Sequence, residues 1–220
     1  MRVVVFEAPG GGRDATVSSL ARALAVPQTS LGDLMRAHLS QGTELGIRVS
    51  EIMNSGSLVP DEILTAVIHD GLYRMAHAGF LLLGYPHRAS QALALEELLR
   101  ELDAPLDSVL HLHLPEAEVE RRIRLLAARR RCRNDRTHRF EPEVDHLLVE
   151  GACNVCGGEL YQHGDEAEIS IRGRFMSYEA MLEPITQHYA RQDLLVTVDA
   201  VGPSDEILRR ALAALQERSP

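Results

Sequence analysis

A short apolar run that ends in a glycine-rich turn places the strongest constraint on how this chain folds. Residues 2–6, RVVVF, are rich in β-branched valine, and Pro9 and the glycines at 10–12 follow them almost at once. A continuous apolar run of this length, bounded by turn residues, is typical of a strand that is buried on both faces of a parallel sheet. The glycines lead into a helical segment at residues 15–25. This order of strand, loop and helix favours an α/β fold.

Strand-like and helix-like segments alternate along most of the sequence. Further buried strands are predicted at residues 79–84, 108–114 and 194–200. Helices are predicted at residues 30–42, 43–56, 60–76 (with Asp61 at its start), 90–102, 169–192 and 204–217. The alternation implies right-handed crossovers and a parallel sheet with helices on both faces. It breaks at about residues 131–167, where Cys, Gly, Pro, Asp and His accumulate, so we expect a small inserted module there.

Length and charge limit the class of protein. At 220 residues the chain fits one domain with a small insertion, and a net charge of −9 argues against a general nucleic-acid binder. Seven of its 23 basic residues nevertheless lie within residues 121–133. Such a run forms either a solvated helix face or a site for a polyanion such as a nucleoside triphosphate. Because the sequence shows neither a signal peptide nor a membrane-spanning run, we expect a cytoplasmic protein without a membrane partner.

The glycine-rich loop has the location and flexibility of a phosphate cradle. Backbone N–H groups converge in such a loop, and the helix that follows presents its partly positive N-terminus. A working loop of the form GxxxxGK[ST] also needs a lysine for the transferred phosphates and a hydroxyl near Mg²⁺. Here Glu7 takes the first glycine position, Arg13 the lysine position and Asp14 the position after it. The loop therefore has the shape of a phosphate site with altered chemistry.

Two pairs of potential metal ligands lie in the predicted insertion. Cys132 and Asp135 form one pair, and Cys153 and Cys156 form another after seventeen intervening residues. This spacing is typical of two zinc knuckles, and three thiolates with one carboxylate form a closed tetrahedral site. The metal would therefore be structural zinc. His138 is a competing fourth ligand.

The chain resembles the adenylate kinase family over essentially its whole length, and in particular the bacterial form with a long zinc-binding lid. The motifs that carry the resemblance are APGGGRDAT, TSLGDLMRAHLSQGTELGIRVSEIMNSGSLVPDE, GFLLLGYPHRASQA and VEGACNVCGGELYQ, in the same order and at nearly constant spacing. The resemblance implies transfer of a phosphoryl group from MgATP to AMP, giving two ADP, by a monomer. It also implies a core at residues 1–30, 57–128 and 168–220, an AMP-binding flap at 31–56 and a lid at 129–167.

The resemblance also assigns roles to residues of the two nucleotide sites. ATP and phosphate binding fall to Gly10, Gly11, Gly12, Arg13, Thr16, Arg129 and Arg130, and AMP binding falls to Arg36, Gly56, Leu58, Val59, Gln91 and Arg174. Arg13, Arg88, Arg129 and Arg174 would be catalytic, with Asp165 and Arg172 close by, because guanidinium groups stabilise the charge of the transferring group. Leu58 and Val59 have an alternative interpretation as core residues. The family's adenine-stacking arginine falls at Leu125 or at Arg124.

Departures from the family pattern cluster on positions that carry chemistry. Arg13 is bulkier than lysine, and Asp14 adds a carboxylate beside the triphosphate or pairs with Arg13. Leu83 replaces the aspartate that holds magnesium through water, and His87 replaces an arginine. Ala15, His163 and Leu31 replace further polar residues. These changes predict weak or altered activity.

Three hypotheses about function follow from the sequence. The first is a nucleoside monophosphate kinase with reduced or altered activity, in which Arg13 and Arg88 take the place of the usual cations. The second is a catalytically inactive nucleotide-binding protein that senses nucleotides or regulates a partner, and Leu83 favours it. The third, a purely structural zinc domain, is disfavoured by Arg36, Gln91, Arg129 and Arg174.

Overall fold

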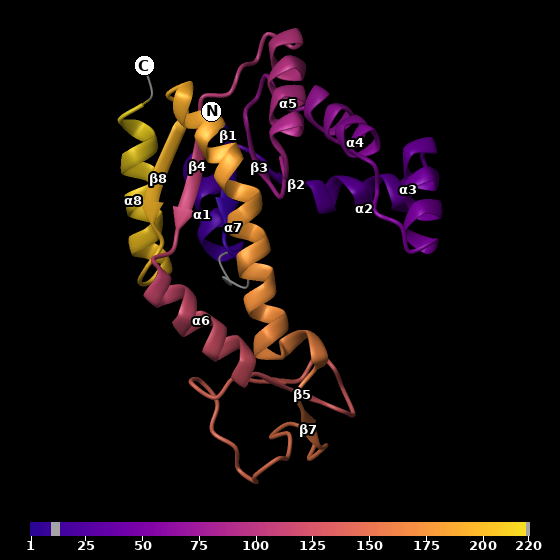
Figure 1. Cartoon of the computed structure of the whole chain (residues 1–220), viewed down its shortest axis with the longest axis vertical. Helices are drawn as coiled ribbons and strands as arrows, with labels where there is room; N and C mark the ends of the chain where they lie inside the picture. The colour runs from indigo at the N-terminus through magenta and orange to yellow at the C-terminus, as the bar shows by residue number, and fades with distance from the viewer. Residues whose placement is uncertain (10–13, 219–220) are drawn as a thin grey trace. The chain divides into compact units, whose positions relative to one another are not determined.

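We describe the protein from a computed structural model, shown in Figure 1, for residues 1–9 and 14–218. The chain forms two compact units. Unit 1 consists of Met1–Glu7, Gly12–His113 and Met181–Pro220, and unit 2 consists of Ala8–Gly11 and Leu114–Ala180. The predicted division into core, flap and lid has other boundaries, and it stays a prediction. No helix within the described residues is both long enough and apolar enough to span a membrane.

A parallel sheet of five strands forms the centre of unit 1, in the order β2-β3-β1-β4-β8. The central strand β1 pairs with β3 on one side and β4 on the other, so that Val4 lies between Leu82 and Val109, and all three side chains are fully buried. The strands are β1 (Arg2–Glu7), β2 (Gln28–Ser30), β3 (Phe80–Leu83), β4 (Ser108–His113) and β8 (Leu195–Asp199). This confirms the predicted parallel α/β fold. The sequence pattern does not predict β2, because three polar residues carry no periodic signal.

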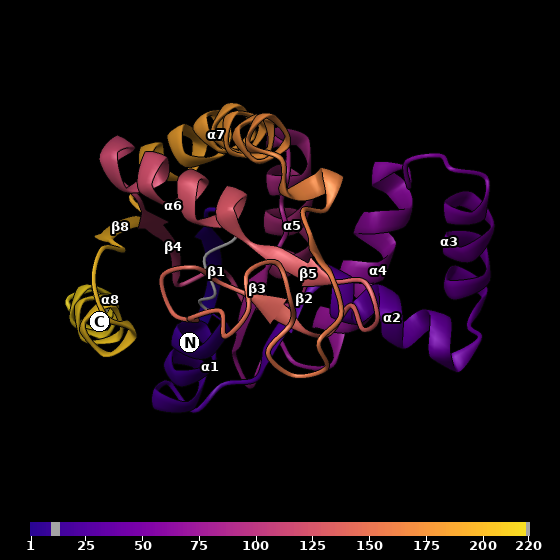
Figure 2. The same ribbon diagram turned by 90° about the horizontal axis from the view of Figure 1, so that it is seen from below.

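Helices cover both faces of this sheet. Figure 2 shows α1 (Asp14–Ala23) and α8 (Ser204–Gln216) on one side of the strands, and α5 (Ala89–Glu101) with the C-terminal part of α7 (Glu168–Arg191) on the other. In α8 the residues that turn inward are Ile207, Ala211 and Leu215, all buried and spaced four apart. That spacing places them on one face of a helix, which is the amphipathic pattern of a helix packed on a core.

Three helices between β2 and β3 form the remainder of unit 1: α2 (Leu31–Gln41), α3 (Glu44–Asn54) and α4 (Asp61–Tyr73). Ser30 caps α2 by accepting a hydrogen bond from the Asp33 N–H, and Gly42 ends it with a φ of 62°. This left-handed conformation favours glycine. Helices α2 and α3 approach closely at Gly46, where a Cβ atom would lie only 2.1 Å from the carbonyl oxygen of His38.

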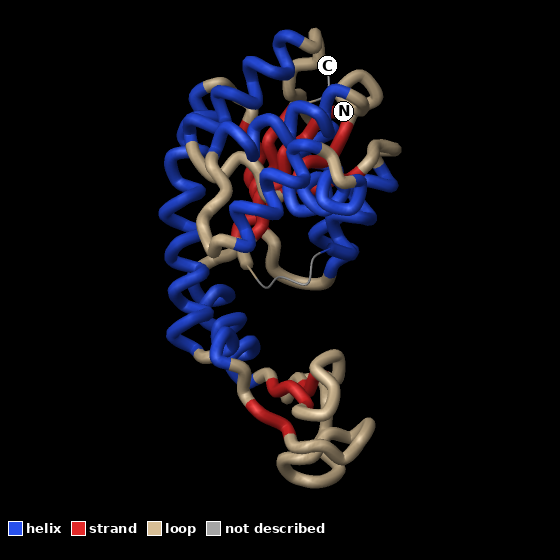
Figure 3. Tube along the Cα trace, turned by 90° about the vertical axis from the view of Figure 1, so that its right-hand side faces the viewer, coloured by secondary structure: helices blue, strands red, loops and turns tan. Residues whose placement is uncertain are grey.

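Unit 2 combines helix with a loop-rich segment. It contains α6 (Glu116–Ala128), the first part of α7, the 3₁₀ helix Gly164–Glu166 and an antiparallel sheet in the order β6-β5-β7. The sheet strands are short: β5 (Arg130–Cys132), β6 (Arg139–Phe140) and β7 (Leu160–Tyr161). Figure 3 shows that loops make up most of this part of the chain. Within residues 130–161, all of them described, only Cys132, Cys153 and Gly158 are buried. We call residues 130–161 the loop-rich segment.

Candidate functional site

The glycine-rich loop between β1 and α1 is the first predicted phosphate site. Gly10, Gly11, Gly12 and Arg13 lie outside the described residues, so the roles expected of them stay predictions. On the helical side of the loop, Thr16 is only 2% exposed. Its Oγ1 atom has no hydrogen-bond partner among the described residues. The hydroxyl therefore lies inside the fold at the first turn of α1.

A hydrogen-bonded cluster joins the start of α4 to the segment after β3. One guanidinium nitrogen of Arg88 donates to both carboxylate oxygens of Asp61, at 2.9 Å each. The side-chain amide of Gln91, which is 2% exposed, donates to Asp61 at 2.9 Å and accepts the backbone N–H of His87 at 2.7 Å. The structure thus brings together the predicted residues Arg88 and Gln91. The structure also places Asp61 in this cluster. Asp61 lies 27 residues from Arg88, so no local sequence pattern could have connected the two residues.

The other residues predicted for the AMP side lie on α2 and after α3. Arg36 pairs with Asp33 at 2.6 Å, and its side chain is 71% exposed. A hydrogen bond from Ser30 is the largest of the effects that together lower the pKa of Asp33. Leu58 is 89% exposed, which excludes the alternative that it is a core residue. Gly56 has a φ of 74°, and Val59 is half-buried.

The carboxyl end of β3 is apolar where the family resemblance leads one to expect an acid. Leu83 ends this strand and lies opposite Val5 of β1. Ligands of open α/β sheets bind outside the carboxyl ends of the strands, and magnesium requires oxygen ligands. An alkyl side chain supplies none. The sequence also contains no lysine, so all 23 of its basic side chains apart from histidine are arginines.

Most arginines of residues 121–133 are held by groups of unit 2. Arg121 and Arg122 donate to Glu118, and the hydrogen bond from Arg121 is the main reason that the pKa of Glu118 falls to about 2. Arg130 donates to the backbone carbonyl groups of Ala127, Ala128 and Arg129 at the end of α6. For Arg121 and Arg122 these contacts favour the first interpretation of the run, a solvated helix face. They leave Arg130 engaged with backbone rather than open to a phosphate.

A cavity of about 190 Å³ within unit 2 is lined by Arg129 and Arg174, which were predicted to be catalytic, and by Asp165, which was predicted to lie near them. Arg131 and Glu166, which the sequence analysis did not single out, line the same cavity. Pockets for drug-sized ligands usually measure about 300–1,000 Å³, so this one fits only part of such a ligand. Arg172, also considered from the sequence, pairs instead with Glu120 and Glu168. In the sequence, Arg131 is marked only by its place in a run of three arginines. Such a run does not indicate which of the three side chains lines a cavity.

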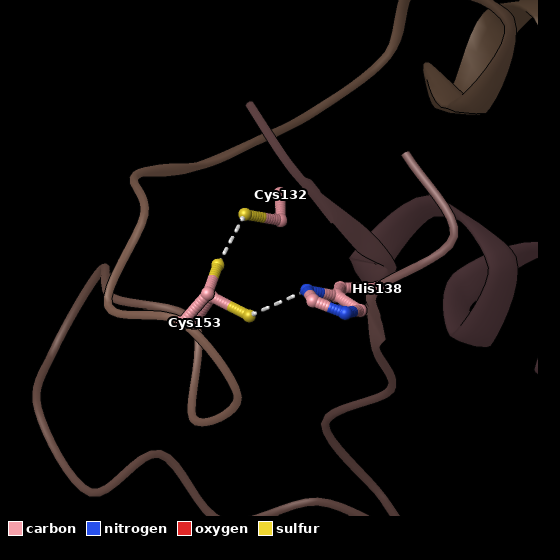
Figure 4. Close-up of side chains that lie close together, drawn as sticks. Cys132, His138 and Cys153 are labelled. Atoms are coloured by element: carbon pink, nitrogen blue, oxygen red, sulfur yellow. Dashed lines mark hydrogen bonds between the residues drawn. The ribbon is translucent and has the colours of Figure 1, made fainter. Parts of the chain in front are cut away.

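The loop-rich segment contains a cluster of potential metal ligands: Cys132, His138, Cys153 and Cys156, whose ligand atoms all lie within 4.8 Å of one another. The sulfur atoms of Cys132 and Cys156 are 3.4 Å apart, and Nδ1 of His138 lies 3.6 Å from the Cys153 sulfur, as Figure 4 shows for the latter pair. Tetrahedral zinc separates such ligand atoms by roughly 3.5–3.8 Å. The donor set and its spacing fit zinc.

The structure distinguishes between the two candidates for the fourth ligand. His138 lies in the cluster, whereas Asp135 is not among its members. Oδ1 of Asp135 accepts hydrogen bonds from the backbone N–H and the hydroxyl of Thr137, and its Oδ2 lies 3.6 Å from Nε2 of His138. The carboxylate therefore faces the ring nitrogen that points away from Cys153. A carboxylate in this place commonly orients a metal-bound imidazole.

The backbone around the cysteines also favours metal binding. N–H groups of Val155 and Cys156 point at the sulfur of Cys153, and they lower the pKa of this thiol despite burial. Metals bind thiolates, so a lowered pKa suits a ligand. Gly158 passes close to the cluster, because a Cβ atom there would lie 2.8 Å from the sulfur of Cys132. Backbone and side chains thus come together around the cluster, with Cys132 and Cys153 buried and Cys156 exposed.

The parallel sheet, the glycine loop after its central strand and the ligand cluster of the loop-rich segment define an α/β protein of the P-loop kinase class. The sequence model of the adenylate kinase family matches residues 5–194. The chain is 46% identical over 217 residues to an adenylate kinase of Streptomyces coelicolor, covering 98% of this chain and 99% of that protein. An adenylate kinase of Methanosarcina barkeri is 34% identical over 220 residues, with 99% of each chain covered. The chain belongs to the adenylate kinase family.

Proposed function

We propose that this chain binds adenine nucleotides and transfers a phosphoryl group from ATP to AMP, giving two ADP, with a turnover below the usual range of kinases. Membership of the adenylate kinase family supports the reaction. The observation that carries the reduced rate is Leu83 at the carboxyl end of β3, where a magnesium-holding carboxylate is missing. The absence of lysine from the sequence adds to it, because Arg13 is too bulky to copy the lysine of a phosphate loop.

Two groups of side chains would carry the reaction. Arg88 and Gln91, held by Asp61, would bind AMP together with Arg36 and the residues from Gly56 to Val59. Arg129 and Arg174 would stabilise the negative charge of the transferring group, since positioning and electrostatics supply nearly all catalysis in such reactions. Magnesium bound with ATP would neutralise phosphate charge. We expect a cytoplasmic monomer that binds no nucleic acid.

We also propose that the loop-rich segment holds one structural zinc ion. Cys132, His138, Cys153 and Cys156 would be its ligands, and Asp135 would orient the imidazole. Four protein ligands leave no open position for a substrate, so this metal would stabilise the fold and take no part in the chemistry. His138 as fourth ligand replaces the Asp135 of the sequence prediction because only His138 lies within the cluster.

Turnover of ATP and AMP to ADP in the presence of magnesium tests the main proposal. An Arg174→Ala variant prepared in parallel shows how much activity comes from a contaminating host kinase. We expect turnover that depends on Arg174 and falls below the range of ~1 to 100 per second that is ordinary for kinases. A rate within that range contradicts the proposed impairment.

The second candidate function is a nucleotide-binding protein without turnover, which Leu83 also favours. A Leu83→Asp variant separates the two candidates, with Leu83→Asn as the matched control. If the phosphate loop still works, the added carboxylate should raise magnesium-dependent turnover by an order of magnitude or more, because transition-state contacts have effects of this size. Calorimetric binding of ADP without turnover in either form supports the second candidate.

A further inference from the structure

The cavity of unit 2 contains an ion pair that neither the sequence pattern nor the family resemblance assigns. Nε and Nη2 of Arg131 both donate to Oε1 of Glu166, at 3.0 and 2.9 Å. Both residues line the cavity. The side chain of Glu166 is only 8% exposed. Its second oxygen, Oε2, is buried and has no hydrogen-bond partner among the described residues. One carboxylate oxygen of Glu166 therefore accepts both hydrogen bonds of the pair, and the other accepts none from the described residues.

The other guanidinium groups of the cavity each make a short contact through one nitrogen atom. Arg129 contacts Glu141 through Nη2 at 2.8 Å, while its Nε is buried without a hydrogen-bond partner in the part of the chain described. Arg174 donates to a backbone carbonyl, that of Asp165, at 2.7 Å. Each of the three guanidinium groups that line the cavity therefore has N–H groups that take no part in these contacts. A phosphate group accepts several such hydrogen bonds at once and carries more charge than one carboxylate.

We propose that Arg131 is a phosphate-binding residue of this cavity, and that Glu166 restrains it by competing with the phosphate for its guanidinium group. The inference rests on the proposed function, since it takes the phosphate chain of a nucleoside triphosphate as the ligand. Nη1 of Arg131 takes part in neither hydrogen bond to Glu166, so a phosphate can begin to bind before the pair separates. The buried carboxylate then repels the incoming anion, which lowers the affinity.

Substitution of each partner separates this inference from a purely structural ion pair. A structural pair predicts that Arg131→Gln and Glu166→Gln harm the protein in the same direction. Competition predicts opposite directions for phosphate affinity, because Arg131→Gln removes an attraction and Glu166→Gln removes a repulsion. The amide of glutamine still accepts hydrogen bonds from Arg131, so the geometry survives the loss of charge. Arg139→Gln is a matched control: Arg139 is the register partner of Arg131 on β6, and it does not line the cavity.

Calorimetric titration of the full, metal-loaded chain with inorganic tripolyphosphate and with ATP measures these affinities. We expect at least tenfold weaker binding for Arg131→Gln, at least tenfold tighter binding for Glu166→Gln, and a change within twofold for Arg139→Gln. Metal content and circular dichroism of each variant establish that it has folded. Equal or weaker binding by a folded Glu166→Gln variant overturns the inference, and so does an Arg131→Gln variant that matches the control.

The same titration separates failure of this inference from failure of the proposed function. A wild-type chain that binds neither tripolyphosphate nor ATP overturns both. ATP binding that depends on Arg174 but is unchanged by Arg131→Gln and Glu166→Gln overturns only the role of Arg131. Tighter binding of ATP by Glu166→Gln without any effect on tripolyphosphate contradicts phosphate competition, because the shared part of the two ligands is the phosphate chain.

Discussion

The buried side chain of Gln91 connects two segments of the candidate site by hydrogen bonds. Its amide accepts the N–H of His87 and donates to Asp61, and it is 2% exposed. A Gln91→Leu variant removes both hydrogen bonds, and a hydrogen bond of this kind contributes about 0.5–1.5 kcal/mol to stability. We expect this loss in the free energy of unfolding in urea. Gln187→Leu, at an exposed position of α7, is the control and should stay within about 0.5 kcal/mol. Equal losses in the two variants contradict the prediction.

His111 on β4 makes stability depend on pH. Burial is the main reason that its pKa falls to about 4, and the neighbouring His113 adds to the effect. The unfolded chain therefore binds the proton more readily than the folded one between about pH 4 and the ordinary histidine pKa of ~6.5. Stability is lost as the pH falls through this window. A His111→Phe variant should show a smaller drop in urea midpoint between pH 7.5 and pH 5 than the wild type.

The control for this pH dependence is His113→Gln, on the same strand but exposed. It removes a titrating imidazole without removing the buried one, so most of the drop should remain. If the urea midpoint of His111→Phe falls as much as that of the wild type, other titrating groups cause the loss of stability at low pH.

Single residues were predictable from the sequence where the family resemblance supplied a motif, and unpredictable where a partner lies far along the chain. Arg88 and Gln91 belong to one motif, whereas Asp61 joins them from 27 residues away. Arg131 and Glu166 are 35 residues apart, and neither stands out by composition. Side-chain orientation decides such pairs, and a sequence pattern without periodicity does not specify orientation.

At the scale of elements, the long helices and the buried strands follow from periodicity and from their glycine and proline boundaries. The loop-rich segment does not. Its strands β6 and β7 have two residues each, too few for an alternating pattern to be recognised. The segment buries few apolar side chains, and its candidate metal ligands are recognisable from their spacing in the sequence although its strands are not.

Metal analysis of two variants tests which residue completes the cluster. With His138 as ligand, His138→Ala should lose most of its zinc after dialysis at a free zinc concentration that keeps the wild type loaded. Asp135→Asn should keep one zinc per chain at saturation and bind it about 10 to 100-fold more weakly, the usual effect of losing a group that orients a ligand. The converse result, with Asp135→Asn losing its zinc and His138→Ala retaining it, restores Asp135 as the ligand.

At the scale of the whole molecule, the two units should respond differently to removal of the metal. Unit 1 has its own buried sheet, whereas the loop-rich segment buries little besides Cys132, Cys153 and Gly158. Metal binding to such a site contributes folding free energy directly. After treatment with a chelator, backbone amides of residues 130–161 should therefore lose most of their protection from hydrogen exchange, while strands β1, β3 and β4 keep theirs. Mass spectrometry of the exchanged peptides measures both.

The control for this exchange experiment is the reloaded protein, which should recover the protection of residues 130–161 after zinc is added back. Loss of protection across β1, β3 and β4 as well would mean that the two units unfold together. Unchanged protection of residues 130–161 would mean that no metal supports them.

A segment that the proposed zinc ion holds in place of an apolar core would tolerate substitutions at some positions far better than at others. In a conventional core, each of many buried positions is sensitive to a change of one methylene group. In this segment, the positions most sensitive to substitution would be the four candidate ligands, Cys132, His138, Cys153 and Cys156. Gly158 would be sensitive as well, because the backbone passes beside the cluster there. Its remaining exposed positions, apart from Asp135, should tolerate changes in charge and size. Substitutions on the surface of this segment should therefore cost less stability than substitutions in the buried sheet of unit 1.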